Sequence, residues 1–330
     1  MAQIGLDIVT TLREPLPLTL AFVAHHLDQG VRALHLYFDD PDDPAIDVVA
    51  HLPRLRITRC DDRHWRRWGG RPTMIVARQV ANAQDCQAQA RSPWLLHCDA
   101  DEFLIRARYV IGLLAANDAR IDVLRLPVWE RCFAPHDDPV ALFGGHCRGP
   151  VMAPATVYGA AAAHLNRGMA AYAGCKSITR VAAGLTIGIH DSAAPTPQGG
   201  SARVRRMTLA RAQMVHVDGL TPAHAAQKLI HRGVEIPDVR RKDIMSPSRS
   251  AQIAGLTDPT TDIDAHFRAL RHLSRDQFAA LQDIDAIMPM PVAPGAAAMR
   301  HWPQVAPLYR KDAFDRIMQT QLAGGWRRSA

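Results

Sequence analysis

The sequence predicts an α/β protein built on a largely parallel sheet. Two observations carry this prediction. The first hundred residues alternate short apolar runs, typical of strands, with longer segments of helical periodicity, which is the pattern of βαβ units. Residues that favour turns separate these segments. Hydrophobic residues make up 48% of the 330-residue chain, so it can bury a sizeable core as one large domain or as a domain with an appendage.

The first two predicted strands enclose a helix. Residues 4–12 form an apolar run that predicts a buried strand. Residues 15–29 carry apolar side chains along one helical stripe, and Gly30 is placed to end that helix. Apolar residues alternate over 33–38, which predicts a second strand. The segment 39–44, rich in aspartate and proline, cannot continue it because proline lacks the amide donor that a strand needs.

A pair of acids follows the fourth predicted strand. Residues 55–58 predict a short third strand, and the alanine- and glutamine-rich segment 73–91 predicts a helix. The apolar run 94–98 then leads directly into Asp99 and Asp101, which one residue separates. Because an open α/β sheet binds ligands at the carboxyl ends of its strands, we expect these acids to lie in a ligand crevice.

The rest of the chain predicts two more strands and then a helical region. The strands cover 121–129 and 186–190, and a proline- and glycine-rich loop at 191–201 is suited to close over a ligand. Helical patterns follow at residues 222–232, 262–273, 276–287 and 312–322, with an irregular connection at 289–307. We therefore divide the chain into an α/β domain, residues 1–235, and a mainly helical C-terminal extension, residues 236–330.

Charge and cysteine content narrow the class of partner and the compartment. The formal net charge of +7 favours anionic partners such as nucleotide phosphates, acidic glycans, nucleic acid or an anionic membrane surface. The excess comes from short basic clusters at 63–71, 203–211 and 240–242 rather than from one tail. The six cysteines form no C-x-x-C pair and no cluster with histidine at zinc spacing, which favours a reducing compartment. No segment approaches the roughly 18 apolar residues of a membrane span, so we expect a cytoplasmic protein with at most peripheral membrane contact.

The two acids are suited to hold a divalent cation. Carboxylates one residue apart can face one ion when the turn after a strand breaks strict alternation, and their oxygens suit Mn²⁺ or Mg²⁺. Such an ion would bridge the diphosphate of a nucleotide and stabilise it as a leaving group. A solvated acidic turn is the alternative, but an apolar strand that ends in W-L-L-H-C-D-A-D-E-F-L is much more specific than an isolated D-x-D.

Around this motif the chain resembles the bacterial glycosyltransferase family 2-type proteins of the GT-A fold, in the branch marked by D-x-D-E-F. The family-like elements occur in the family's order over about residues 4–233. They are Thr11-Leu12-Arg13-Glu14, His25-His26, Gly30-Val31, Tyr37-Phe38-Asp39-Asp40, Gln79, Lys176-Ser177-Ile178, His190, and His216 through Thr221 with Lys228. Three positions depart from the family: Arg13 replaces an asparagine, and Val217 and Leu220 replace a tyrosine and a lysine.

The resemblance implies a Rossmann-like GT-A domain, with a central, mostly parallel sheet flanked by helices, and a set of site residues. Asp99 and Asp101 would bind the Mn²⁺ or Mg²⁺ ion, with His216, or alternatively His190, completing its shell. The residues that would contact the donor are Thr11, Arg13, Glu14, Asp39, Gln79, Asp99 and Lys176. The general base would be Glu130, Asp137 or Asp138, after the strand at 121–129. Helix caps, turns and solvated positions are the alternative explanation for these polar residues.

The resemblance also implies a function. The chain would transfer a sugar, with inversion, from a nucleotide-sugar donor to a glycan or lipid-linked acceptor in surface polysaccharide assembly. A nucleotidyltransferase stays open as an alternative, although the glycine- and arginine-rich loop that such an enzyme carries near its N-terminus does not follow the first predicted strand. A nucleic-acid-binding protein, suggested by the charge, and a noncatalytic carbohydrate-binding relative also stay open.

Overall fold

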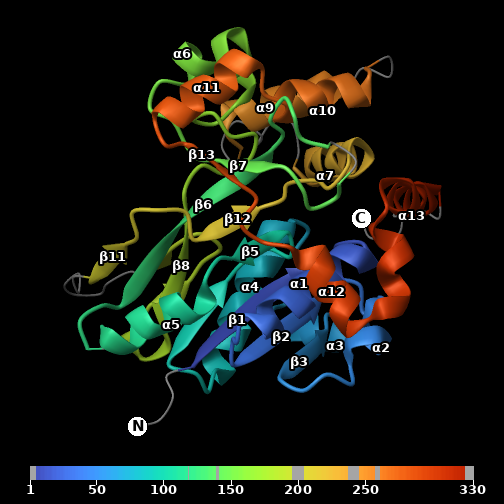
Figure 1. Ribbon diagram of the computed structural model, residues 1–330. Coiled ribbons are helices and arrows are strands. Elements are labelled where there is room, and N and C mark those ends of the chain that lie inside the picture. The colour runs from blue at the N-terminus through green and yellow to red at the C-terminus, as the bar shows by residue number, and fades with distance from the viewer. Residues whose placement is uncertain are drawn as a thin grey trace. The chain divides into compact units, whose positions relative to one another are not determined.

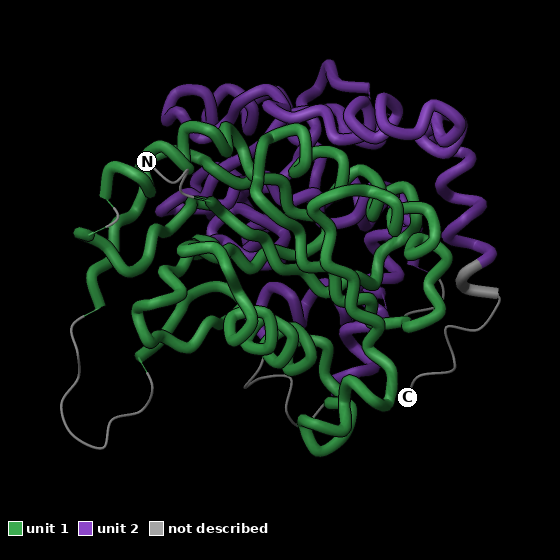
Figure 2. Tube along the Cα trace, turned by 90° about the horizontal axis from the view of Figure 1, so that it is seen from below, with its two compact units in different colours: residues 1–127, 174–214 green, residues 128–173, 215–330 purple. Residues whose placement is uncertain are grey.

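The computed structural model describes residues 5–117, 119–138, 141–194, 204–236, 245–256 and 261–323 (Figure 1). The chain forms two compact units, each made of two separate stretches of sequence (Figure 2). Unit 1 comprises Met1–Pro127 and Gly174–Met214, and unit 2 comprises Val128–Ala173 and Val215–Ala330. The division of the chain after residue 235 stays a prediction. Most of the loop predicted at 191–201 and the basic cluster at 240–242 lie outside the described residues.

Four parallel strands form the centre of unit 1 (Figure 1). They lie in the order β3 (Leu55–Arg59), β2 (Ala33–Phe38), β1 (Leu6–Leu12) and β4 (Trp94–His97). All seven residues of β1 are buried, as its central position requires. The order places the first strand beside both the second and the fourth, which is the arrangement of a Rossmann-type sheet. The predicted strands and their parallel pairing are confirmed.

The sheet of unit 1 also contains antiparallel strands that come from later in the chain. β8 (Cys175–Arg180) lies between β4 and the first half of β6 (Val123–Cys132) and runs antiparallel to both. β11 (Arg206–Thr208) pairs in parallel with β6. The sheet is therefore mixed, and β8 brings its residues next to the strand that precedes the acids.

Helices pack on this sheet where the sequence predicts them. α1 (Leu16–Asp28) ends two residues before Gly30, whose φ of +87° suits glycine and whose amide donates to the carbonyl of Leu27 at 3.1 Å. α4 (Ile75–Gln89) packs on one face of the sheet, where its residues join Val9, Tyr37 and Leu95 in one core. The shorter helices of unit 1 are α2 (Ala45–Val49), α3 (Asp62–Arg66) and α5 (Ala107–Ala116), with the 3₁₀ turn η2 (Val181–Ala183).

One strand prediction in unit 1 is only partly right. The segment 186–190 forms just the two-residue strand β9 (Thr186–Ile187), paired with β10 (Ser192–Ala193). The amide of Gly188 donates to the carbonyl of Asp191, three residues further along the chain, so a turn begins at Gly188. The short strand β5 (Glu102–Leu104) follows the acids.

Unit 2 is a short antiparallel ribbon with helices. The second half of β6 pairs with β7 (His146–Arg148), and β7 pairs with β13 (Ile287–Pro289). Cys132, Tyr158 and Leu281 belong to one hydrophobic core, which joins this ribbon to helices of the unit. The elements of unit 2 are α6 (Pro154–Tyr158), η1 (Gly159–His164), α7 (Pro222–Glu235), α9 (Pro247–Leu256), α10 (Ile263–Arg271), α11 (Arg275–Asp283), α12 (Pro294–His301), η3 (Pro303–Tyr309) and α13 (Lys311–Ala323). The strand β12 (Met214–His216) begins in unit 1 and ends in unit 2.

The helices predicted in the C-terminal region are confirmed, with two corrections. α11 ends at Asp283, and the residues from Ile287 belong to β13 rather than to the helix. The irregular connection predicted at 289–307 is wrong, because α12 and η3 occupy most of it. Pro294 stands in the first turn of α12, where a missing amide costs no helical hydrogen bond. In the described part of the chain, no helix is both long and apolar enough to cross a membrane.

Candidate active site

Asp99 is held at the carboxyl end of β4 by side chains from two other elements. Nε2 of Gln79, on α4, donates to its Oδ1 at 2.6 Å, and Nζ of Lys176, on β8, donates to its Oδ2 at 2.9 Å. The side chain of Asp99 is still 28% exposed. The structure therefore brings three of the predicted donor-binding residues together around one partly accessible carboxylate.

Lys176 is shared between two acids. Its side chain is fully buried, and its Nζ also lies 2.9 Å from Oε2 of Glu102. The same oxygen of Glu102 accepts the backbone amide of Asp99 at 2.9 Å, which fixes the turn between β4 and β5. Burial alone would lower the pKa of the Lys176 ammonium, but the two carboxylates outweigh burial and raise its pKa. The ammonium therefore stays charged.

The charge on Asp99 follows from the same contacts. Burial would raise the pKa of its carboxyl group, but the Lys176 ammonium, helped by His97, holds that pKa well below its usual range. Burial, with Lys176, lowers the pKa of the neighbouring His97 to about 4. At neutral pH the site thus presents an ionised Asp99 beside a neutral His97 imidazole.

His190 belongs to the same region of unit 1. Nδ1 of His97 lies 3.3 Å from the carbonyl oxygen of Ile189, and Oγ of Ser177 donates to the carbonyl of His190 at 3.0 Å. The electrostatic effect of His190 also lowers the pKa of Asp99, less than those of Lys176 and His97 do. The loop that carries His190 is therefore attached to the strands that position the acids.

The second acid of the motif and the other predicted imidazole ligand lie in different units. Asp101 is 2% exposed and stands just before β5 in unit 1. His216 ends β12 and belongs to unit 2. That these residues share one ion stays a prediction.

The two histidines of the family-like pair anchor the segment after the acids. His25 Nε2 donates to the carbonyl of Leu104 at 2.9 Å, and the amide of Leu104 donates to His26 Nε2 at 3.2 Å. Burial lowers the pKa of both imidazoles, so both stay neutral at physiological pH. This pair of contacts ties α1 to β5 and explains a motif whose purpose the sequence does not show.

Asp39, after β2, is already neutralised within the protein. It lies 2.9 Å from a guanidinium nitrogen of Arg71 and 2.8 Å from Nε of Arg78, and its side chain is 2% exposed. Arg78 also donates to the carbonyls of Pro72 and Thr73, which shapes the segment before α4. Neither arginine was predicted as a site residue. The basic cluster at 63–71 is a signal for Arg71 but does not include Arg78.

Thr11, at the end of β1, joins a buried polar network. Its Oγ1 accepts from Asn82 Nδ2 at 2.9 Å, and Asn82 Oδ1 lies 2.8 Å from Nε2 of His64. Arg13 and Glu14 follow two and three residues later. Because β1, β2 and β4 are parallel, these residues stand at the same edge of the sheet as Asp39 and Asp99.

The three predicted general bases all belong to unit 2. Glu130 is fully buried, and its carboxylate accepts from Arg148 at 3.0 Å and from the amides of Ala170 and Ala171 at 2.7 and 2.8 Å. These contacts are those of a structural carboxylate. Asp137 is partly buried and Asp138 is exposed.

The last family-like signature builds the beginning of α7. Thr221 is the N-cap of this helix, and its Oγ1 accepts the amide of His224 at 3.4 Å. Gly219 has a φ of +85°, and a Cβ there would lie 2.5 Å from the Cβ of Ala225. Asp218 is buried, and Arg249 and Arg271 each approach its carboxylate to 3.0 Å. Lys228 lies on the same helix.

No family model matches the chain, and no curated protein matches it in sequence. The chain is similar to several solved structures. S. aureus TarS 1–349 in complex with UDP is 11% identical, with a TM-score of 0.35, over 98% of this chain and 93% of that chain. The same protein in complex with UDP-GlcNAc gives 11% identity and a TM-score of 0.34 over the same shares.

A synthetase is similar over a smaller part of the chain. CMP:2-keto-3-deoxy-manno-octonic acid synthetase, complexed with CTP, is 19% identical with a TM-score of 0.26, over 38% of this chain and 53% of that chain. At likenesses of this size, the fold assignment rests on the strand order and pairing described above.

Proposed function

We propose that this chain is a metal-dependent glycosyltransferase that takes its sugar from a nucleoside-diphosphate donor. The observation that carries the proposal is the setting of Asp99, a partly exposed carboxylate that Lys176 keeps ionised and Gln79 orients. A solvated acidic turn would need neither partner. Burying an ammonium group is unfavourable unless it is well paired, so a fully buried lysine at this position indicates a carboxylate that must be held in place.

The donor atoms fit Mn²⁺ or Mg²⁺. An ionised carboxylate offers about four lone-pair positions, and Gln79 and Lys176 occupy only part of those on Asp99. We assign the ion to Asp99 and Asp101, with His216 or His190 as its imidazole ligand. When bound, the ion would neutralise charge on the departing nucleoside diphosphate.

The protein's own residues would bind and orient the donor. Thr11, Arg13 and Glu14 stand at the carboxyl end of β1, where the nucleoside would lie. Asp39 is nearly inaccessible and already paired, so we assign it the role of holding Arg71 and Arg78 rather than of contacting the nucleotide.

The proposal extends to the acceptor. An inverting transfer needs a base that can reach the acceptor hydroxyl. The carboxylate of Glu130 is enclosed by its partners, so it is not carried into the proposal. Asp138 is the exposed candidate. We further propose that the acceptor is a glycan or a lipid-linked molecule and that the reaction serves surface polysaccharide assembly. The same proposal places the protein in the cytoplasm.

The pairing of the arginines speaks against the nucleic-acid-binding alternative. In the basic cluster at 63–71, Arg67 lies 2.7 Å from Asp85 and Arg71 lies 2.9 Å from Asp39. Guanidinium groups that neutralise the protein's own carboxylates contribute little to phosphate binding. Fewer arginines of this cluster are therefore left to form a basic surface for nucleic acid.

The test compares aspartate variants in the presence of Mn²⁺ and a panel of nucleotide sugars. Asp101→Asn and Asp99→Asn should each abolish release of nucleoside diphosphate, while the circular dichroism spectrum stays that of a folded protein. Asp62→Asn is the matched control, because Asp62 is an exposed aspartate in the first turn of α3 and should leave turnover unchanged. Equal turnover in Asp101→Asn and Asp62→Asn would overturn the proposal.

A further inference from the structure

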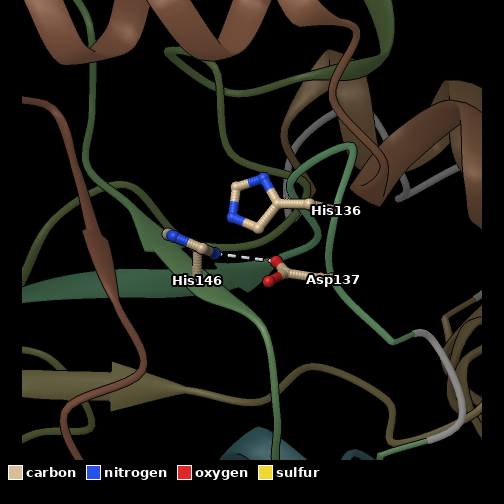
Figure 3. Close-up of side chains that lie close together, drawn as sticks. All are labelled: His136, Asp137 and His146. Atoms are coloured by element: carbon tan, nitrogen blue, oxygen red, sulfur yellow. Dashed lines mark hydrogen bonds and ion pairs between the residues drawn. The ribbon is translucent and has the colours of Figure 1, made fainter.

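A second group of possible metal ligands lies in unit 2. His136 and Asp137 stand in the turn after β6, and His146 begins β7. One ligand atom from each residue lies within 4.8 Å of the other two. Figure 3 shows the His136 ring and the Asp137 carboxylate both directed toward His146, whose Nδ1 donates to Asp137 Oδ2 at 2.7 Å.

The backbone around these residues holds them in place. Asp137 Oδ2 accepts the amide of Ala134 at 2.6 Å, and the amide of Asp137 donates back to the carbonyl of Ala134 at 3.1 Å. His146 pairs with Cys132 of β6 and with Pro289 of β13, so it lies on the middle strand of the ribbon. A turn and a strand therefore fix two of the three ligands before any ion binds.

Gly145 is required for this approach. Its φ is +100°, and a Cβ at this position would lie 2.6 Å from the carbonyl oxygen of Cys132 and 3.6 Å from Asp137 Oδ2. A larger residue would push the start of β7 away from the end of β6, to which the turn with Asp137 is joined. Glycine at this position therefore lets β7, and with it His146, begin close to the end of β6.

An aromatic side chain supports both imidazoles. Phe278, on α11, meets the His136 ring edge-on at 5.5 Å and the His146 ring edge-on at 5.3 Å between centroids. The two imidazoles lie 5.4 Å apart and are nearly perpendicular. His136 is exposed, whereas the side chains of Asp137 and His146 are each 12% exposed, so the group is open to solvent on one side.

We propose that His136, Asp137 and His146 bind a zinc-type transition-metal ion, separate from the cation at Asp99 and Asp101. Two imidazole nitrogens and one carboxylate oxygen are a donor set that suits Zn²⁺ better than Mg²⁺ or Mn²⁺. Three protein ligands leave a fourth position for water on the exposed side. The ion fastens the turn after β6 to β7 and so stabilises unit 2.

Binding requires one rearrangement with a defined proton balance. Metal–ligand bonds of about 2.0 Å place two ligand atoms of a tetrahedral site roughly 3.3 Å apart, so the 2.7 Å contact between His146 and Asp137 must open by roughly half an ångström if Nδ1 is the ligating atom. Histidine ligates zinc as a neutral imidazole that keeps one N–H, so ligation by Nδ1 of His146 also requires that its proton move to Nε2.

The experiment uses the full chain, stripped of metal, titrated with Zn²⁺ in competition with a chromophoric chelator. His136→Ala is the main variant, because an exposed ring can be removed with little effect on folding. His164→Ala, an exposed histidine of the same unit, is the matched control. The expected result is one zinc ion per chain, bound at least about a hundredfold more weakly by His136→Ala and unchanged in His164→Ala.

Two further measurements separate this site from the one in unit 1. Asp101→Asn should retain the zinc ion, and replacing zinc by Co²⁺ should give visible absorption bands that His136→Ala lacks. Equal zinc affinity of His136→Ala and wild type, or no binding by the metal-free wild type, would overturn the proposal. Loss of the ion in Asp101→Asn but not in His136→Ala would assign zinc to the proposed active site instead and would also overturn it.

Discussion

Nζ of Lys176 lies 2.9 Å from Oδ2 of Asp99, although 77 residues separate the two along the chain. The lysine is fully buried and the aspartate is partly exposed. This pairing makes Asp99 a fixed, ionised carboxylate at the carboxyl end of a parallel strand.

Lys176→Met should destabilise the fold strongly. It leaves the carboxylates of Asp99 and Glu102 near each other without the buried ammonium that they share, and breaking a buried pair in this way costs about 3–5 kcal/mol. Lys311→Met is the control, because Lys311 and Asp315 form a more exposed i,i+4 pair that contributes only about 0.5 kcal/mol. Urea denaturation measures both free energies of unfolding. Equal losses would show that Lys176 does not hold the site together.

Gln79→Ala should lower turnover without lowering stability. Gln79 orients Oδ1 of Asp99 from a half-buried position on α4, so its removal disturbs the geometry of the site more than the core. We expect kcat to fall by about tenfold or more. Gln89→Ala is the control, since Gln89 lies on the same helix and donates to the carboxylate of Asp85 at 2.9 Å. A similar effect of both variants on kcat would contradict the role assigned to Gln79.

His97 should make the fold less stable as the pH falls from about 6.5 to about 4. Its pKa is lowered to about 4 in the folded protein, mainly by burial, whereas the unfolded chain titrates near the ordinary value of about 6.5. Between these values the unfolded chain binds more protons, so the stability present above pH 6.5 declines by a few kcal/mol. Free energies of unfolding across this range should show a shallower slope for His97→Asn. Identical slopes would mean that His97 is not buried as a neutral imidazole.

A nucleoside diphosphate together with Mn²⁺ should raise the melting temperature more than either alone. A ligand bound only by the folded state at a hundred times its Kd adds about 2.7 kcal/mol, which corresponds to a shift of a few degrees. Thermal melts across UDP, GDP, CDP, ADP and TDP, with and without Mn²⁺, measure the effect. An unchanged melting temperature with every combination of nucleoside diphosphate and Mn²⁺ would favour the noncatalytic alternative.

The sequence predicts the parallel core of unit 1 well, for a local reason. β1 and β4 are largely apolar, β2 alternates apolar with polar residues, and turn-forming residues follow each; these signals need no information from distant parts of the chain. The position of Asp99 at a strand end follows from the same pattern. The β8 strand is harder to predict because Lys176 and Ser177 interrupt its apolar character, yet both are buried by contacts with other segments.

The parts that sequence reasoning missed depend on contacts between distant residues. Nothing local shows that Arg78 pairs with Asp39, since 39 residues separate them. The group formed by His136, Asp137 and His146 has no cysteine and a spacing unlike that of the common zinc motifs, so a search by spacing does not find it. The expectation of an irregular connection at 289–307 overlooks α12, which has Pro294 in its first turn, where proline is compatible with a helix.

The most direct measurement of the central claim is the release of nucleoside diphosphate from nucleotide sugars as the divalent cation is removed and restored. The protein is assayed with Mn²⁺, then with excess chelator, and again after Mn²⁺ is added back beyond the chelator. We predict turnover of at least one nucleotide sugar in Mn²⁺, loss of that turnover in chelator and its recovery on addition of Mn²⁺. Turnover that continues undiminished in excess chelator would contradict the assignment of a catalytic cation to Asp99 and Asp101.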